Sequence, residues 1–147
     1  LHALGDLEEA KKTVEACLKM RYTIYGTDKV HPEIATSLNN LGEVLQALGD
    51  LEEAKRKFEA CLKMRYAVYG TDKAHPEIAT SLNNLGGVLQ DLGDLEEAKR
   101  KYEACLKMEC RIYAMNESHP EIKVTRDNLE RVILAIQAKN SAKSKEK

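Results

Sequence analysis

The sequence has no tryptophan, only 5% aromatic residues and no run of roughly 20 apolar residues, the length that a membrane-spanning helix needs. Neither sign of charge dominates, because 23 Lys and Arg stand against 24 Asp and Glu. The chain therefore has no basic footprint for nucleic acid. With 43% hydrophobic residues it is not compositionally disordered, and its three prolines and eight glycines exclude collagen-like fibres.

What the sequence does contain is an internal repeat of 44 residues. Residues 3–46, 47–90 and 91–134 are three copies of one unit, and the first two copies differ at seven positions. The third copy stays similar up to Met108 and then diverges. A fixed period of this length is typical of a helical repeat array in which neighbouring units stack.

Each copy carries the start and end signals of two helices. The first, helix A, opens at His31-Pro32-Glu33, since proline suits the first helical position and glutamate suits the positive end of the helix dipole. Its apolar face is formed by Leu38, Leu41, Leu45 and Leu48. Asp50, with Glu53 three residues later, forms a capping-box pattern that opens helix B, and Gly70 is expected to end helix B in a left-handed conformation.

These signals predict six helices and a tail. We expect helices over residues 6–25, 33–47, 50–69, 77–91, 94–113 and 121–138. Residues 33–69 and 77–113 form helix hairpins, and residues 1–5 are the end of a helix whose beginning is absent. The last helix is a polar cap, because Arg126 and Glu130 place charge where a further helix would pack. The helical domain thus spans residues 1–138, and residues 139–147 form a disordered, lysine-rich tail.

The order and spacing of these residues resemble the tetratricopeptide repeat. The matching positions are Leu38, Leu41, Gly42, Leu45, Gly49, Ala54, Phe58, Cys61 and Leu62. The pair His31-Pro32 and the run Leu38-Asn39-Asn40-Leu41 are similar to the longer repeats of kinesin light chains. This resemblance implies an all-α fold, a right-handed solenoid of antiparallel helix hairpins, and a scaffold that binds proteins or peptides.

The A helices carry a polar stripe opposite their leucines. The resemblance places A helices on the concave side of the array, and the seven aromatic residues all lie in B helices instead: Tyr22, Tyr25, Phe58, Tyr66, Tyr69, Tyr102 and Tyr113. We therefore predict a polar peptide-binding groove. Its predicted residues are Thr36, Asn39, Asn40, Glu43, Gln46, Thr80, Asn83, Asn84, Gln90, Asn128 and Arg131.

Two interpretations of the repeated asparagines remain open. Asn40, Asn84 and Asn128 either hydrogen-bond the backbone of a bound peptide, as the resemblance implies, or form hydrogen bonds between helices that stabilise the stack. Asn39 and Asn83 are expected to be solvated. A clamp for a terminal carboxylate is disfavoured, because Arg131 is the only cation beside these asparagines.

The cysteines are predicted to have a structural role rather than a reactive one. Cys17, Cys61 and Cys105 occupy the same position of successive B helices, which is normally alanine, so we expect small buried side chains. Free thiols favour a reducing, cytoplasmic location.

The sequence predicts no catalytic or metal site. His31, His75 and His119 recur at helix starts, where they are expected to cap helices or to pack in the loops, and no partner spacing suits a metal ion. The chain shows no phosphate-binding loop or nucleophile motif. We therefore expect neither an enzyme nor a cofactor.

A second hypothesis is a self-assembling spacer. The apolar stripe of the first predicted helix would lack a packing partner, which favours homo-oligomerisation. This stripe consists of Leu7, Ala10, Val14, Cys17 and Leu18. In either hypothesis the partner is a protein or peptide, with no role for nucleic acid or a membrane.

Overall fold

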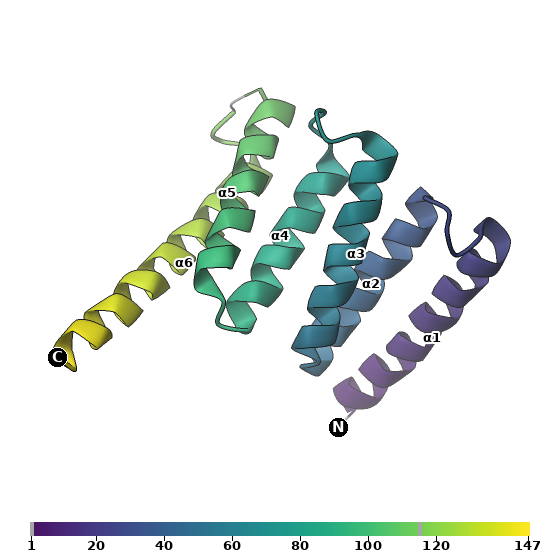
Figure 1. Ribbon diagram of the computed structural model, residues 1–147, viewed down its shortest axis with the longest axis horizontal. Helices are drawn as coiled ribbons and strands as arrows, with labels where there is room; N and C mark the ends of the chain where they lie inside the picture. The colour runs from purple at the N-terminus through teal and green to yellow at the C-terminus, as the bar shows by residue number, and fades with distance from the viewer. Residues whose placement is uncertain (1, 115) are drawn as a thin grey trace. The chain divides into compact units, whose positions relative to one another are not determined.

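The computed structural model describes residues 2–114 and 116–147, and all regular secondary structure in these ranges is α-helical (Figure 1). The helices are α1 (His2–Tyr25), α2 (Pro32–Leu48), α3 (Leu51–Tyr69), α4 (Pro76–Asp91), α5 (Leu95–Ile112) and α6 (Pro120–Lys145). The predicted all-α fold is confirmed. The bounds of α2 to α5 differ from the predicted ones by at most one residue.

The chain divides into two compact units, Leu1–Lys73 and Ala74–Lys147. The first unit contains α1, α2 and α3, and the second contains α4, α5 and α6. In each unit, consecutive helices pack against each other. None of the described helices is both long and apolar enough to cross a membrane.

Each A helix begins at a histidine whose side chain caps it, as the sequence predicts. The Nδ1 atoms of His31 and His75 accept hydrogen bonds of 3.1 Å from the second amide N–H after them, and that of His119 accepts one of 3.3 Å. A proline follows each histidine in the first helical turn. The rings of Tyr25 and Tyr113, which end the preceding B helices, stack on His31 and His119 with centroids 3.6 Å apart.

The link between α2 and α3 corrects the predicted capping box. The Asp50 side chain makes no capping hydrogen bond. The backbone N–H of Asp50, which Glu53 would bond in a capping box, donates instead to the carbonyl of Leu45 at 2.9 Å and closes the end of α2. Gly49 takes a left-handed conformation there, with φ of 86°. Glu53 pairs with Arg56 and with Lys57 rather than with the start of its own helix. Gly70 is the C-cap of α3 and has a positive φ of 89°, as predicted, but its ψ of 160° lies outside the left-handed helical region.

Within each hairpin, an aromatic ring of helix B lies directly against a glycine of helix A. A Cβ added at Gly42 would stand 2.6 Å from Phe58 Cε1, and one at Gly86 would stand 2.8 Å from Tyr102 Cε1. Such distances are too short for any side chain. The glycine is therefore required for close approach of the two helices rather than for backbone conformation.

The cysteine prediction holds for two of three positions. Cys61 and Cys105 are fully buried, but Cys17 is exposed. The equivalent face of α1 has no described helix of a preceding unit packed on it. Leu18, one residue further, is 8% exposed because it faces α2 and belongs to the core of the first unit.

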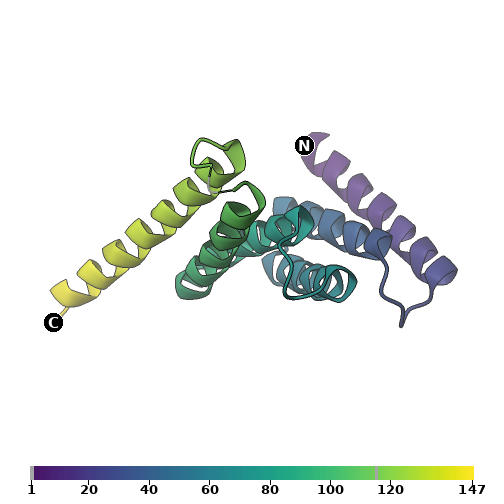
Figure 2. The same ribbon diagram turned by 90° about the horizontal axis from the view of Figure 1, so that it is seen from above.

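Both ends of the helical region differ from the prediction. Helix α1 is continuous from His2 through Gly5, whereas residues 1–5 were expected to belong to a separate helix. A segment this short cannot nucleate a helix alone, so it extends the next one. Helix α6 continues to Lys145, which corrects the predicted end at 138 and the disordered tail. Residues 139–145 contain no proline or glycine, and Lys143 and Lys145 favour the negative helix end. This extension is yellow in Figures 1 and 2. Its residues Lys139, Asn140 and Lys143 line a small pocket together with residues 93–96, where α4 leads into α5.

Candidate functional site

The predicted polar stripe of the first unit lies on α2, and its residues differ in their surroundings. Asn39 is only 7% exposed and donates a hydrogen bond of 3.0 Å to the carboxylate of Glu43, so it is not the solvated side chain that the sequence predicts. Asn40 is exposed, and its side chain makes no hydrogen bond within the described part of the chain. Gln46 is half-buried, and Thr36 donates to the Pro32 carbonyl of its own helix.

In the second unit, two predicted groove residues form a bond between A helices. The side-chain amide of Asn128 on α6 donates to Asn83 Oδ1 on α4 at 3.1 Å. For Asn128 the structure therefore contains the inter-helix hydrogen bond that was the alternative to peptide binding. Asn83 takes part in it, so it too is not merely solvated. Asn84 is half-buried and Arg131 is exposed.

Gln90 and Thr80 are also engaged inside the second unit. Gln90 Oε1 accepts a hydrogen bond of 3.2 Å from the hydroxyl of Tyr102, whose ring packs against Gly86. Gln90 thus helps to fix α5 on α4. Thr80 donates to the Pro76 carbonyl one turn earlier, as Thr36 does on α2, and its side chain remains exposed.

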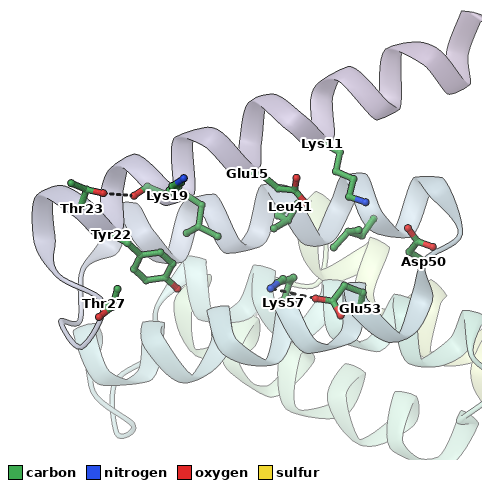
Figure 3. A pocket seen from close by; sticks show the side chains of 12 residues that line it. Lys11, Glu15, Lys19, Tyr22, Thr23, Thr27, Leu41, Asp50, Glu53 and Lys57 are labelled. Carbon is green, nitrogen blue, oxygen red and sulfur yellow. Dashed lines mark hydrogen bonds and ion pairs between the residues drawn. The ribbon is translucent and has the colours of Figure 1, made fainter.

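The first unit also contains a pocket of about 650 Å³ that lies between α1, α2 and α3 (Figure 3). Leu18, Leu41, Leu45 and the ring of Tyr22 supply its apolar surface. Figure 3 shows Lys11 and Tyr22 extending from α1 toward α3, where Lys57 pairs with Glu53 at 3.4 Å. Sequence reasoning missed this pocket, because its leucines belong to the ordinary core stripe of α2.

A smaller and more acidic pocket of about 190 Å³ lies in the second unit. Its walls are Pro76, Ala79, Thr80 and Asn83 of α4, Glu109 of α5, Tyr113 and Glu121. The structure thus brings two predicted groove residues, Thr80 and Asn83, beside two carboxyl groups that the sequence analysis did not select.

Glu109 is unusual for an acidic residue, because only 4% of its surface is exposed. Its Oε1 atom accepts hydrogen bonds from the Thr125 hydroxyl at 2.9 Å and from the Cys105 thiol at 3.2 Å. Its Oε2 atom is buried and has no partner among the described residues. Burial raises the pKa of the Glu109 carboxyl, and the two hydrogen bonds only partly oppose this effect.

The internal repeat shows what Glu109 replaces. The equivalent residues of the first two copies are Arg21 and Arg65. In the first unit, Arg21 Nη1 donates to Ser37 Oγ at 2.6 Å and to the Glu33 carbonyl at 2.7 Å. This exchange of arginine for glutamate is visible in the sequence and is the signal that could have identified the pocket.

The family of the chain follows from its sequence. The sequence model of the tetratricopeptide repeat matches residues 1–67 and 33–110. The chain belongs to the tetratricopeptide repeat family. Its hairpins, with a small residue of helix A under an aromatic residue of helix B, are the tetratricopeptide units that the sequence predicts. Among curated proteins, no match to the sequence was found.

Solved structures place these repeats among similar tetratricopeptide folds. BtubC (BKLC) from P. vanneervenii is 22% identical with a TM-score of 0.74, over 89% of this chain and 49% of that one. The nearly identical TPR-like repeats of a candidate kinesin light chain from Podosopora anserina are 21% identical with a TM-score of 0.77, over 87% and 58% of the two chains. A single-substitution variant of those repeats is 20% identical with a TM-score of 0.79, over 90% and 60% of the two chains.

These comparisons confirm the predicted resemblance to the repeats of kinesin light chains. At identities near one fifth they establish the fold alone. The chain spans about half to three fifths of the length of these structures. Tetratricopeptide repeats generally mediate protein–protein interactions, and this is the broad functional class to which the chain belongs.

Proposed function

We propose that this chain is a scaffold that binds an extended peptide segment of a partner protein on the polar faces of its A helices. Helix α2 would contribute Asn40 in the first unit, and α4 would contribute Asn84 in the second. A side-chain amide suits this task, because it offers a donor and an acceptor to a peptide backbone. The proposal assigns no catalytic reaction to the chain.

The observation that supports the proposal is that the side chain of Asn40 is exposed and forms no hydrogen bond within the described residues. Asparagine in a helix interior is less favourable than alanine by up to about 0.7 kcal/mol. Asn39 offsets this cost with its hydrogen bond to Glu43, but Asn40 is exposed and has no such bond within the described residues. The exposed side-chain amide of Asn40 lowers helix stability and forms no hydrogen bond that would compensate for it, which favours a role in binding.

A peptide-binding experiment tests the proposal. Peptides selected on the chain from a displayed random library are titrated against the wild type, Asn40→Ala and Asn39→Ala by calorimetry. We expect Asn40→Ala to weaken binding about tenfold, which corresponds to about 1.4 kcal/mol, while the folded domain becomes slightly more stable. Asn39→Ala is the matched control, and it should lower stability because it removes the hydrogen bond from Asn39 to Glu43. Equal affinity of the wild type and Asn40→Ala would overturn the proposed role of α2.

A second candidate function is self-association through the terminal helices. Large apolar side chains are exposed on α1 at Leu4 (55%), Met20 (64%) and Ile24 (66%), and on α6 at Leu134 (56%). Light scattering across a range of concentrations tests this function, with Met20→Lys/Ile24→Lys as the disrupting variant. A monomer at every concentration would argue against assembly, whereas a wild-type dimer that the variant abolishes would support it.

The free thiols support a proposal about the cellular compartment of the chain. All four cysteines are free, and the buried Cys105 thiol has its pKa raised, chiefly by desolvation. Free thiols persist in reducing compartments, so we propose that the chain is cytoplasmic. Fractionation of cells that express it is the direct test, and recovery from an oxidising compartment would contradict the proposal.

A further inference from the structure

The buried carboxyl group of Glu109 lies in a pocket that no lysine or arginine of the described residues lines. The two lining residues from the end of α5 and the start of α6, Tyr113 and Glu121, add a phenol and a second carboxyl group. The ionisable groups facing Glu109 are Cys105 on its own helix and His119 and Glu121 at the start of α6, while α4 lines the pocket with uncharged residues only. The pocket is therefore acidic, and the buried Oε2 atom of Glu109 lacks a donor among the described residues.

We propose that this pocket binds the guanidinium group of an arginine side chain from the bound peptide. The inference rests on the proposed peptide binding and names one side chain of the ligand. Thr80 and Asn83 of the predicted polar stripe line the same pocket, so a peptide lying along α4 passes its opening.

The first unit shows that a guanidinium fits this environment. There the chain itself supplies the cation, because Arg21 occupies the position of Glu109 and bonds Ser37 and the Glu33 carbonyl. Thr125 stands at the repeat position of Ser37, and Glu121 at that of Glu33. In the third copy the cation is exchanged for a carboxyl group, which leaves room for a cation from outside.

The size and chemistry of the pocket favour a guanidinium over a metal ion or a single water. Its volume of about 190 Å³ is far larger than the roughly 15 Å³ that one water needs. The planar guanidinium has five N–H donors, which can serve Glu109 Oε2, Glu121 and the amide oxygen of Asn83 together. In the described ranges, no group of three or more His, Cys, Asp or Glu side chains could hold a metal ion.

The burial of Glu109 also favours an external cation. A buried carboxylate without a counter-charge is costly, and such a group keeps its proton instead. The raised pKa of Glu109 reflects this cost in the chain by itself. A bound guanidinium would pair with the carboxylate and release that proton, so binding and deprotonation of Glu109 are coupled.

The test uses N-acetyl-arginine methylamide as the probe, with its uncharged isostere N-acetyl-citrulline methylamide as the control. The full chain, with its glutamate carboxyl carbons labelled with ¹³C, is titrated with each probe at pH 7 and followed by NMR. We expect the arginine probe to shift the Glu109 carboxyl resonance in a saturable manner, and the citrulline probe to bind at least about tenfold more weakly.

Two variants show whether the shift comes from this pocket. Glu109→Gln keeps the shape and removes the charge, and Glu109→Arg restores the residue of the other two copies. Saturable binding should be lost in both, with the fold checked by circular dichroism. Binding that persists in Glu109→Gln, or no shift of Glu109 in the wild type, would overturn the inference. Equal binding of the corresponding lysine probe would overturn the assignment to arginine.

The outcomes separate this inference from the proposed function. If library peptides bind in an Asn40-dependent manner but the arginine probe does not, the scaffold function stands and the arginine site is wrong. If the arginine probe binds in a Glu109-dependent manner but no peptide does, the site stands and the proposed peptide groove is wrong.

Discussion

Thr125 donates a hydrogen bond of 2.9 Å to the buried carboxyl group of Glu109, at the repeat position where Ser37 accepts one of 2.6 Å from Arg21. The hydroxyl group reverses its role between the two units, since it can both donate and accept. One position of helix B therefore carries a guanidinium group in one copy of the unit and a carboxyl group in another. The consequence is electrostatic, because the second unit holds a buried carboxyl group that pairs with no lysine or arginine of the described residues.

This carboxyl group should make stability depend on pH. Burial raises the pKa of Glu109 above the ordinary 4.5, so between that value and the native pKa the folded state holds a proton that the unfolded state has released. The free energy of unfolding must then fall as pH rises through this window. Glu109→Gln should remove this fall, which urea unfolding at a series of pH values measures.

The control for this prediction is Glu103→Gln on the same helix. Glu103 is exposed and pairs with Lys99 at 3.7 Å, so its loss should leave the pH profile nearly unchanged. If Glu109→Gln and the wild type lose stability in parallel as pH rises, Glu109 is not the group responsible.

A second prediction concerns the contact of Gly42 with Phe58. Gly42→Ala places a methyl group within 2.6 Å of the ring, and α2 and α3 must separate to accommodate it. We expect a loss of about 1–3 kcal/mol in the free energy of unfolding, which is the usual cost of overpacking.

Gly5→Ala is the matched control for this substitution. Gly5 is also helical, but nothing lies within 4 Å of a Cβ added there, so alanine should stabilise the chain by up to about 1 kcal/mol. A Gly42→Ala variant as stable as Gly5→Ala in thermal unfolding would show that the two helices of the hairpin are not closely packed at this point.

A third prediction tests the histidine cap. His31→Ala removes the acceptor of the Glu33 N–H and also the ring that stacks on Tyr25. The variant should lose about 1 kcal/mol of stability. His31→Asn keeps an acceptor but not the stacking, so it should recover most of this loss. If alanine and asparagine are equally destabilising in urea unfolding, the stacking and not the cap stabilises the start of α2.

Much of the fold could be predicted, because its determinants are local. The His-Pro pairs and the leucine spacing fix where α2 and α4 begin and which face they bury. The return bond from Glu53 in the predicted capping box is absent, because the end of α2 competes for the same backbone N–H of Asp50 and takes it. The predicted helix break at Gly5 is absent because the segment before it is too short to form a helix of its own and extends α1 instead.

The candidate site was less accessible to sequence reasoning. The sequence pattern identifies which residues lie on the polar face opposite the leucines, but it does not show which of them form hydrogen bonds with one another. Asn128 and Asn83 are 45 residues apart, and only the packing of α6 beside α4 brings them together. The pocket around Glu109 likewise combines three helices. Its one sequence signal, the replacement of arginine by glutamate in the third copy, gains meaning only when the position is seen to be buried.

The C-terminal extension of α6 provides a last prediction. Residues 137–147 are exposed, so the helix there depends mainly on its own backbone hydrogen bonds and on local contacts such as Ser144 to the Asn140 carbonyl at 3.2 Å. Its other neighbours are residues 93–96, which line a small pocket with Lys139, Asn140 and Lys143. Ala142→Pro should abolish helical Cα chemical shifts over residues 139–145, since proline removes an N–H and clashes with the preceding turn. The thermal unfolding of the rest of the chain should be unchanged. Ser141→Ala is the control and should strengthen the same helical shifts, because alanine is the better helix former. Random-coil shifts over these residues in the wild type would instead favour the disordered tail that the sequence alone predicts.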